Sequence, residues 1–442
     1  MLATGIILPV SSIIYNVFFH PLRSVPGPKS WAATPFPYIF TWLSGRLHLA
    51  IHELHETYGD VVRVAPNRLS FTHPDAWNAI RGHRKNGKGE HGKELMFYIA
   101  ALRNIIGAPR EEHSRFRRIL SHGFSAKSMQ EQQPLIKRHV DLLMQRLKEK
   151  THDEDGKPQP AVADLAAWFN FTTFDVIGDL AFGEPFGCLE ESRYHAWVRA
   201  IIGTNSQLSV VQALQWVIPS LSVFLSNFNP NHGRFLGSAL RRSLQYAQDK
   251  IAKRLALETS RPDFVEAMAT AKSDDGSMLA MDEIVAHGRL LVSAGSETTA
   301  TALSAAAYFL SRYPEVQARL AKEVRDAFTS EDEIDLFSVN RLKYMLAFLD
   351  ETLRMFPPLP SQLPRTCHPA GDVICGYYVP GGTSLDISTW AMHHSSRNFT
   401  APDKFLPERW FDEVDPTGLK FDKSRHGAFQ PFSVGPPSPM LR

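Results

Sequence analysis

The sequence predicts a large, mainly α-helical protein with a few small β-sheets, and three observations lead to that fold class. Several long stretches repeat apolar residues at three- and four-residue spacing, as one face of a helix requires. Two other stretches are rich in strand-forming residues and contain Pro-Asn or Gly-Gly turn signals. With 442 residues, of which 43% are hydrophobic and 21% charged, the chain has ample material for a large core.

The N-terminal residues are mostly apolar but are interrupted by Pro9 and Asn16. This is marginal against the roughly 20 residues that a spanning helix needs, so we expect a weak membrane anchor over residues 1–19. An amphipathic or core-packed segment is the alternative. No positive n-region or A-x-A site marks a cleaved signal peptide. Arg23 and Lys29 follow the apolar segment directly, so we expect the chain after that segment to lie on the cytosolic side of the membrane.

The remaining elements follow in chain order. Residues 20–31, HPLRSVPGPKSW, predict a proline-rich hinge, after which residues 32–442 form the globular body. Residues 60–71 predict a hairpin that turns at Pro66 and Asn67. Strand character returns over residues 371–389, with a Gly-Gly turn. Between these two stretches the apolar spacing predicts helices over residues 125–150, 164–181, 238–258 and 283–312.

Charge and cysteine content exclude some classes of function. The formal net charge is +2 and the basic residues are spread along the chain, so nucleic acid is excluded as a partner. The three cysteines, Cys188, Cys367 and Cys375, cannot form a disulfide framework in so long a chain, and none lies in a C-x-x-C pair that would favour zinc. We therefore expect a reducing, cytosol-facing location.

The longest predicted helix has a polar centre, AGSETT, over residues 294–299. Glycine and threonine lower helix stability, and a threonine hydroxyl competes for the carbonyl one turn back. We therefore expect the hydrogen-bond ladder to open locally and to form a groove lined by Glu297 and Thr298, suited to a small ligand and a proton relay. A patch of small residues where two helices cross is the alternative.

Two short motifs predict an ionic network. ETLR places Glu351 and Arg354 three residues apart on one helical face. FLPERW supplies Arg409, which can complete a three-membered network because arginine suits a buried, planar link with several donors. The alternative for the ETLR pair is a surface ion pair worth under about 1 kcal/mol.

Taken together and in this order, these motifs resemble the cytochromes P450, which are haem-thiolate monooxygenases. AGSETT is similar to the oxygen-groove motif of that family, ETLR to its E-x-x-R motif and PERW to the arginine segment that pairs with it. FHPLRSVPGP resembles the hinge after the membrane anchor, and AMHHSSRNFTAPDKFLPERW resembles the stretch ahead of the haem loop. The hinge and HSRFRRILSHGFS look most like microsomal P450s of fungal secondary metabolism.

The resemblance implies an activity and its partners. Thr298 would hydrogen-bond dioxygen and, with Glu297, deliver protons, while Glu351, Arg354 and Arg409 would form a structural network behind the haem. The family inserts oxygen into an apolar small molecule, here expected to be a secondary metabolite, with electrons from NADPH-cytochrome P450 reductase. The expected location is the endoplasmic reticulum membrane, with the catalytic domain facing the cytosol.

The implied cofactor is haem b. Its propionates would meet His113, Arg117 and Arg365, whose charge-assisted bonds are strong. The haem loop of the family reads F-x-x-G-x-R-x-C-x-G, and Phe432 and Gly435 in FSVGPPSPMLR fit its beginning.

The rest of that loop departs from the family pattern. Pro437 stands where the arginine belongs, Pro439 where the thiolate cysteine belongs, and Leu441 where the last glycine belongs. Cys367 and Cys375 lie upstream of PERW, in the strand region, and do not replace the ligand. Proline has no donor atom, so we expect no metal ligand, poor haem binding and loss of monooxygenase activity.

We also expect a C-terminally truncated, partly folded P450 that lacks the cysteine loop, the following helix and the terminal sheet. Two alternatives stay open. One is an active P450 whose true C-terminus is longer, and the other is a non-catalytic, membrane-tethered binding protein that keeps the apolar pocket.

Overall fold

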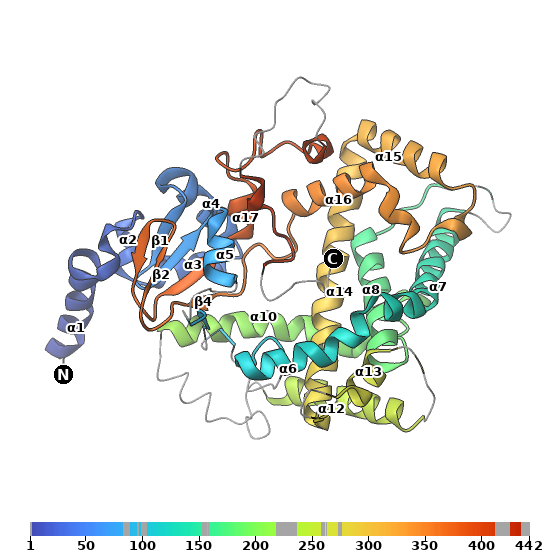
Figure 1. Ribbon diagram of the computed structural model, residues 1–442, viewed down its shortest axis with the longest axis horizontal. Helices are drawn as coiled ribbons and strands as arrows, with labels where there is room; N and C mark the ends of the chain where they lie inside the picture. The colour runs from blue at the N-terminus through green and yellow to red at the C-terminus, as the bar shows by residue number, and fades with distance from the viewer. Residues whose placement is uncertain are drawn as a thin grey trace. The chain divides into compact units, whose positions relative to one another are not determined.

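The computed structural model describes residues 2–82, 89–94, 97–98, 104–152, 157, 159–217, 237–257, 261, 263–272, 276–411 and 425–434. Within these residues it confirms the predicted class, a mainly helical protein with small sheets (Figure 1). The chain divides into two compact units. Unit 1 comprises residues 1–99, 208–224 and 347–442, and unit 2 comprises residues 100–207 and 225–346.

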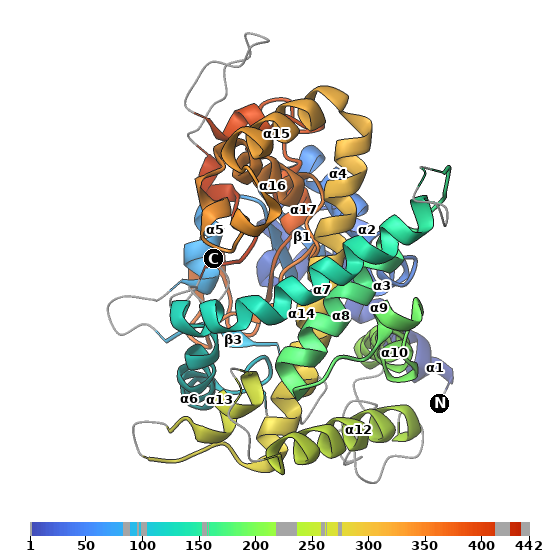
Figure 2. The same cartoon turned by 90° about the vertical axis from the view of Figure 1, so that its right-hand side faces the viewer.

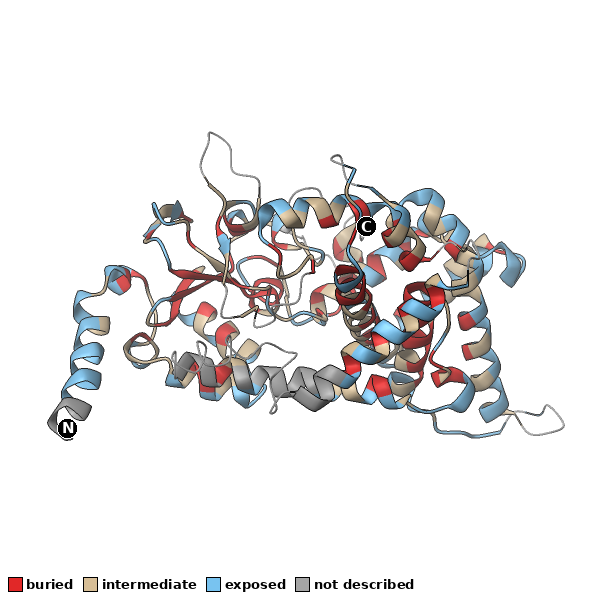
Figure 3. Ribbon diagram, turned by 90° about the horizontal axis from the view of Figure 1, so that it is seen from below, coloured by how far each residue is buried: buried red, intermediate tan, exposed pale blue. Residues whose placement is uncertain are grey.

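Unit 1 begins with short helical elements: α1 (Leu2–Ile14), η1 (Tyr15–Phe19), η2 (Pro21–Ser24), α2 (Lys29–Ala33), α3 (Phe36–Leu43) and α4 (Leu47–Tyr58). The first of them, α1, has 13 residues, about 20 Å at 1.5 Å per residue, whereas a bilayer core is about 30 Å thick. Figure 3 shows its described part as mostly exposed. No helix in the described part of the chain has the length and apolarity to cross a membrane.

The main sheet of unit 1 has the strand order β1-β2-β7-β4-β3. These strands are β1 (Val61–Ala65), β2 (Arg68–Phe71), β7 (Ser384–Ile387), β4 (Arg365–Thr366) and β3 (Gly92–Lys93). The first two form the predicted hairpin around Pro66 and Asn67, and both are buried along their whole length. The second pairs in parallel with β7, which aligns Leu69 with Leu385.

The second segment with strand character forms more than one element. A separate hairpin consists of β5 (Asp372–Ile374) and β6 (Tyr377–Val379), and it turns at Cys375 and Gly376, both at positive φ. The predicted Gly-Gly turn precedes β7. Unit 1 also contains α5 (Asp75–Arg81), α17 (Thr389–His393), η6 (Pro407–Trp410) and η7 (His426–Ala428). Trp77 lies in its core and donates its indole N–H to the carbonyl of Ala428 at 3.1 Å.

Unit 2 is helical in its described residues. Its elements are α6 (Arg110–Ser121), η3 (His122–Phe124), α7 (Ala126–Thr151), α8 (Leu165–Phe182), α9 (Cys188–Glu191), α12 (Gly237–Leu255), α13 (Phe264–Thr270), α14 (Met281–Arg312), α15 (Pro314–Ala327), η4 (Glu331–Glu333) and η5 (Ser338–Arg341). The chain passes from one unit to the other within α10 (Ala196–Val217) and again within α16 (Lys343–Met355). All four predicted helices are present, as α7, α8, α12 and α14.

Two packed helices form the centre of unit 2. Figures 1 and 2 show α8 running alongside α14, and the two make extensive contact. α8 begins where the side chain of Asp164 accepts a hydrogen bond from the amide of Ala167 at 3.1 Å, and it ends at Gly183, which has φ 76°. Because most of its residues from Phe171 onward are buried, α8 supports α14 from within the unit.

Candidate functional site

The polar centre of α14 does not open the helix. The helix is continuous from Met281 to Arg312, so the expected break in the hydrogen-bond ladder is wrong. The hydroxyls of Ser296 and Thr298 donate to the carbonyls one turn back, on Val292 and Ala294, at 2.5 and 2.7 Å. These side-chain bonds add to the ladder instead of replacing it, which explains why polar residues are tolerated here.

Gly295 lets α14 approach its neighbour closely. A Cβ atom at this position would lie 3.2 Å from Cδ1 of Ile177 on α8. The alternative interpretation of AGSETT, a small-residue crossing point, therefore describes this face of the helix. Glu297 and Thr298 are half-buried side chains on the following residues of α14, and their proton-relay role stays a prediction.

His113 and Arg117 lie one turn apart on α6, as their spacing predicts. Both side chains are half-buried. Partial burial lowers the pKa of Arg117 from its ordinary value. Between them, Phe116 is fully buried and packs edge-on against the ring of His287 on α14, at 4.6 Å between centroids. This anchor holds α6 to α14 within unit 2.

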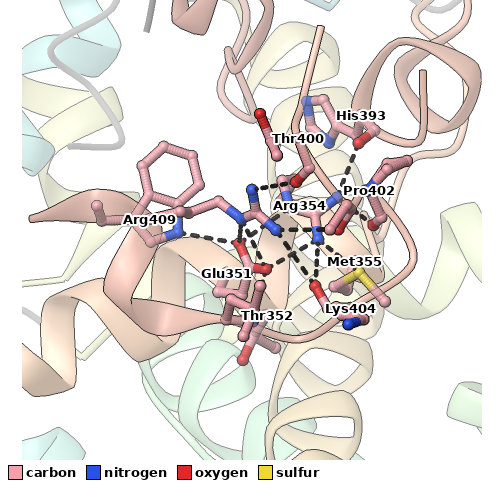
Figure 4. Close-up of polar contacts among 12 residues, drawn as sticks. Glu351, Thr352, Arg354, Met355, His393, Thr400, Pro402, Lys404 and Arg409 are labelled. Carbon is pink, nitrogen blue, oxygen red and sulfur yellow. Dashed lines mark hydrogen bonds and ion pairs between the residues drawn. The ribbon is translucent and has the colours of Figure 1, made fainter. Parts of the chain in front are cut away.

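Glu351, Arg354 and Arg409 meet in a buried network in unit 1 (Figure 4). Arg354 donates from Nε and Nη2 to the two carboxylate oxygens of Glu351, at 2.9 and 2.8 Å. The Nε of Arg409 lies 2.9 Å from both of those oxygens. The carboxylate also accepts the amide of Leu406 at 2.9 Å and the indole N–H of Trp410 at 3.1 Å. One carboxylate thus joins α16 to η6.

Backbone carbonyls use the remaining arginine donors. Arg354 donates to the carbonyls of His393 and Pro402 at 2.9 and 2.8 Å, and Arg409 donates to those of Thr400 at 2.9 Å and Ala401 at 3.2 Å. Removal of a charged partner from a buried pair is costly, whereas a fully hydrogen-bonded set is stable. The network is therefore no surface ion pair, and its geometry suits a structural role.

Arg365 lies on β4, directly opposite Lys93 on β3. Its Nε atom is buried and has no hydrogen-bond partner among the described residues. Burial, followed by the nearby charge of Arg365, lowers the pKa of Lys93 to about 8. The structure therefore places a second cation beside the predicted propionate ligand.

The predicted haem loop is only partly described. Phe432 is 44% exposed, and Gly435, Pro437, Pro439 and Leu441 lie outside the described residues. Upstream of it, Phe429 packs against the Trp410 ring of the ionic network, with 4.4 Å between centroids. This contact links the segment ahead of the loop to η6.

Comparison with known proteins identifies the family. The model of the family described as Cytochrome P450 matches residues 28–438. The chain belongs to the cytochrome P450 family. It is 42% identical over 434 residues to trichothecene C-15 hydroxylase of Fusarium sporotrichioides, which covers 98% of this chain and 85% of that protein. It is 40% identical over 436 residues to averantin hydroxylase of Dothistroma septosporum, covering 97% of this chain and 78% of that protein.

A third relative agrees with these two. Cytochrome P450 monooxygenase astJ of Aspergillus oryzae is 40% identical over 427 residues, covering 96% of this chain and 83% of that protein. The chain is therefore a member of the P450 monooxygenases of fungal secondary metabolism.

The residues of this P450 fit one end of a haem better than the other. Propionates require cations, and Arg365 offers a buried, unbonded Nε in the described part of the chain. The axial position requires a thiolate sulfur, and the sequence has proline at position 439. The propionate end thus has a matching residue in the described part of the chain, and the lack of a thiolate ligand stays a prediction from the sequence.

The three cysteines of the P450 lie at the start of α9, in the core of unit 1 and in the turn between β5 and β6. Cys188 is buried at the start of α9, where burial raises the pKa of its thiol to about 12. Cys367 donates its S–H to the carbonyl of Val379 at 3.4 Å, in the core of unit 1. Burial also raises the pKa of Cys375 to about 12, so Cys188 and Cys375 stay protonated near neutral pH. Metal ligation requires the thiolate, which these surroundings disfavour.

Sequence reasoning found residues that are neighbours along the chain or share a motif, and it missed partners that only folding brings together. It did not consider Lys93 or Arg81, although both carry charge close to Arg365. The sequence around Lys93, GEHGKE, gives no signal of a strand or of a binding site. Trp410 ends the quoted PERW motif, so its role as a donor to Glu351 was within reach.

Proposed function

We propose that the reaction associated with this P450 is the hydroxylation of an apolar fungal secondary metabolite, and that the chain with proline at position 439 holds haem without a thiolate and does not complete that reaction. The first part is supported by the names of two relatives, a trichothecene hydroxylase and an averantin hydroxylase. The second is carried by one observation: Pro439 stands at the ligand position and the cysteines are placed elsewhere.

Bound haem with a thiolate on its iron supplies the electronic push that favours O–O cleavage in this family. Other roles fall to the chain itself. We assign proton delivery to Glu297 and Thr298 on α14, where the Thr298 hydroxyl is held by its bond to the carbonyl of Ala294. Glu351, Arg354 and Arg409 hold the segment ahead of the haem loop in place and take no part in the chemistry.

We propose that the protein acts at the endoplasmic reticulum membrane, faces the cytosol and accepts electrons from NADPH-cytochrome P450 reductase. Support comes from exposed apolar side chains on the N-terminal elements of unit 1, which include Leu8 and Phe19 at 71% and 65% exposure. Exposed apolar side chains of this kind suit contact with a lipid surface. The exposed apolar side chains of these N-terminal elements are Ile7, Leu8, Val10, Ile13, Ile14, Tyr15, Phe18, Phe19, Phe36, Phe40 and Leu43.

Flotation with lipid vesicles tests the membrane proposal. The full chain should float with vesicles of neutral and anionic phospholipids, and Phe19→Ser combined with Phe40→Ser should float less. A double variant that remains fully bound would contradict this assignment.

A carbon monoxide spectrum of the reduced protein tests the haem proposal. The 442-residue chain, expressed with added haem precursor, should lack the thiolate-type absorption band. The matched comparison is the chain with Pro437→Arg, Pro439→Cys and Leu441→Gly, which restores the family pattern and should gain that band if the rest of the site is intact. A thiolate band or substrate hydroxylation by the unaltered chain would overturn the inactivity proposal.

A further inference from the structure

A cavity of about 280 Å³ lies within unit 1. Its lining comes from α3, α4, β2 and β7, from Gln212 of α10 and from residues 360–364, which follow α16. The volume is close to the roughly 300 Å³ at which ligand pockets of proteins begin. Among the described residues that line it, none is predicted to meet haem or dioxygen. The proposed function therefore leaves this cavity without a role.

Three aromatic side chains line the cavity. Tyr38 and Trp42 on α3 lie edge to face, with 6.4 Å between their ring centroids. The Trp42 ring is nearly parallel to that of Phe97, with an interplanar angle of 15° and a centroid distance of 6.4 Å. Gln212 donates from Nε2 to the carbonyl of Phe97 at 2.8 Å and so fixes the segment that carries this ring. Because aromatic faces stack, such a lining suits a flat aromatic ligand.

One buried carboxylate, that of Asp386 on β7, has an oxygen that is open to the cavity. Its Oδ2 atom accepts hydrogen bonds from Nη1 of Arg68 at 2.6 Å and from the hydroxyl of Tyr38 at 3.4 Å. Its Oδ1 atom accepts none from the described residues, although Asp386 is only 6% exposed. Oδ1 is not sealed within the protein either, so it opens onto the cavity that Asp386 lines. A carboxylate oxygen accepts strongly from the donor of a ligand.

Gln362 and Ser388 add polar groups to the same lining. The side-chain amide of Gln362 donates from Nε2 to the hydroxyl of Thr389 at 3.1 Å, and its Oε1 atom accepts no hydrogen bond from the described part of the chain. The hydroxyl oxygen of Ser388 accepts the amide of Ala391 at 3.4 Å, which leaves its own proton available for donation. The cavity thus offers acceptors and a donor, as a ligand hydroxyl requires.

The charges around Asp386 favour a neutral ligand over a cation. Asp386 shares the guanidinium of Arg68 with Glu94, which contacts it through both oxygens at 2.7 Å. The charge of Asp386 also acts on Arg81. An ammonium ligand would therefore join cations that already compensate this carboxylate. A phenol hydroxyl supplies the hydrogen bond without adding a charge.

We propose that this cavity binds a hydroxylated aromatic molecule, a phenol of about the size of a naphthol. The aromatic rings of the ligand contact Trp42 and Phe97, and its hydroxyl donates to Oδ1 of Asp386. The inference goes beyond the proposed function, because the site needs neither haem nor a thiolate.

Two naphthalene derivatives test the proposal. 2-Naphthol carries the hydroxyl donor, and 2-methoxynaphthalene has the same rings without that donor. Isothermal titration calorimetry measures the affinity of each for the full chain. In Asp386→Asn the amide oxygen stays with Arg68, so an NH2 group faces the cavity in place of the acceptor. This variant should weaken the binding of 2-naphthol about tenfold or more and leave that of 2-methoxynaphthalene unchanged.

Three further variants sharpen the test. Trp42→Ala removes a ring from the lining and should weaken both probes alike. Glu53→Gln neutralises an exposed carboxylate on α4 in the same unit and should change neither affinity. If circular dichroism shows that Asp386→Asn does not fold, Gln362→Met replaces it. That variant keeps the pair of Asp386 and Arg68 and should weaken 2-naphthol alone, about threefold.

The outcomes either support the site or overturn it. Loss of affinity for 2-naphthol alone, in Asp386→Asn or in its replacement, is the expected result. Equal weakening of both probes by that variant, or no weakening of either, would overturn the assignment of the cavity lining as the partner of the hydroxyl. An unaltered chain that binds neither probe would rule out a phenol site. None of these outcomes depends on haem, so the proposed function is tested separately.

Discussion

Two groups of buried or half-buried charges in unit 1 show opposite designs. In the network of Glu351, Arg354 and Arg409, a carboxylate lies between two guanidiniums and backbone carbonyls accept the other donors. On β3 and β4, Lys93 lies opposite Arg365, and the buried Nε of Arg365 has no hydrogen-bond partner among the described residues. In the first group, every carboxylate oxygen of Glu351 accepts hydrogen bonds from the two arginines.

The difference distinguishes a structural role from a binding role. A set of charges that is satisfied internally stabilises the fold and gains nothing from a ligand. A buried donor without a partner costs stability until a ligand accepts its hydrogen bond, and that loss is recovered as binding free energy. Hydrogen-bond satisfaction, and not burial alone, thus separates the two groups.

The largest expected effect comes from breaking the network at its centre. Glu351→Gln leaves Arg354 and Arg409 buried without a counter-charge, which should lower the free energy of unfolding by about 3–5 kcal/mol. Urea denaturation of the full chain measures this. Glu149→Gln, which breaks the exposed pair with Arg146, is the control and should leave the free energy of unfolding almost unchanged. Similar values for the two variants would show that the network is not a structural centre.

A substitution that keeps the charge of the network but changes its geometry should lower the free energy of unfolding by less. Arg409→Lys keeps a cation near Glu351 but loses the planar fork that reaches the carbonyls of Thr400 and Ala401. We expect the free energy of unfolding to fall by about 1.5–3 kcal/mol in the same assay. Arg146→Lys in the exposed pair is the control and should leave it unchanged. An unaffected Arg409→Lys variant would mean that charge alone holds the network.

The free energy of unfolding should rise as the pH rises through the titration of Lys93. Because the pKa of Lys93 falls from 10.5 to about 8 on folding, the unfolded chain binds more protons between these values, and the folded state gains stability as pH rises through that window. Without porphyrin, Lys93→Met should be more stable than the unaltered chain at pH 7, by less than about 1 kcal/mol because the site is partly exposed to solvent.

That stability difference should vanish near pH 10.5, where the lysine is neutral in both states. Arg365 and Tyr98 face Lys93 and are present in both proteins, so their titration largely cancels in the comparison. A difference that grows with pH would contradict the lowered pKa of Lys93.

The smallest expected effect is on the rate at which the amine of Lys93 is chemically labelled. At pH 8 about half of Lys93 is unprotonated, so an amine-acylating reagent should label it faster than exposed Lys29, as read by peptide mass spectrometry. Equal labelling rates for the two lysines in the free protein would contradict the lowered pKa.

Local spacing was enough to predict much of the fold and part of the site. The four long helices and the hairpin at Pro66 follow from apolar period and turn chemistry, which act between neighbouring residues. The pairing of Glu351 with Arg354 is equally local, since both lie on one face of α16. By contrast, the predicted break in α14 was wrong, because its hydroxyls bond within the helix and Ile177 of α8 packs at Gly295.

The sequence by itself determined which family the chain resembles, which segments are helices and strands, and that proline stands at position 439. Only the tertiary structure decided that Lys93 lies opposite Arg365 and that Trp410 completes the bonds to Glu351. The reason is physical: spacing along the chain encodes contacts between near neighbours, whereas strand register and the meeting of distant charges depend on the packing of the whole unit.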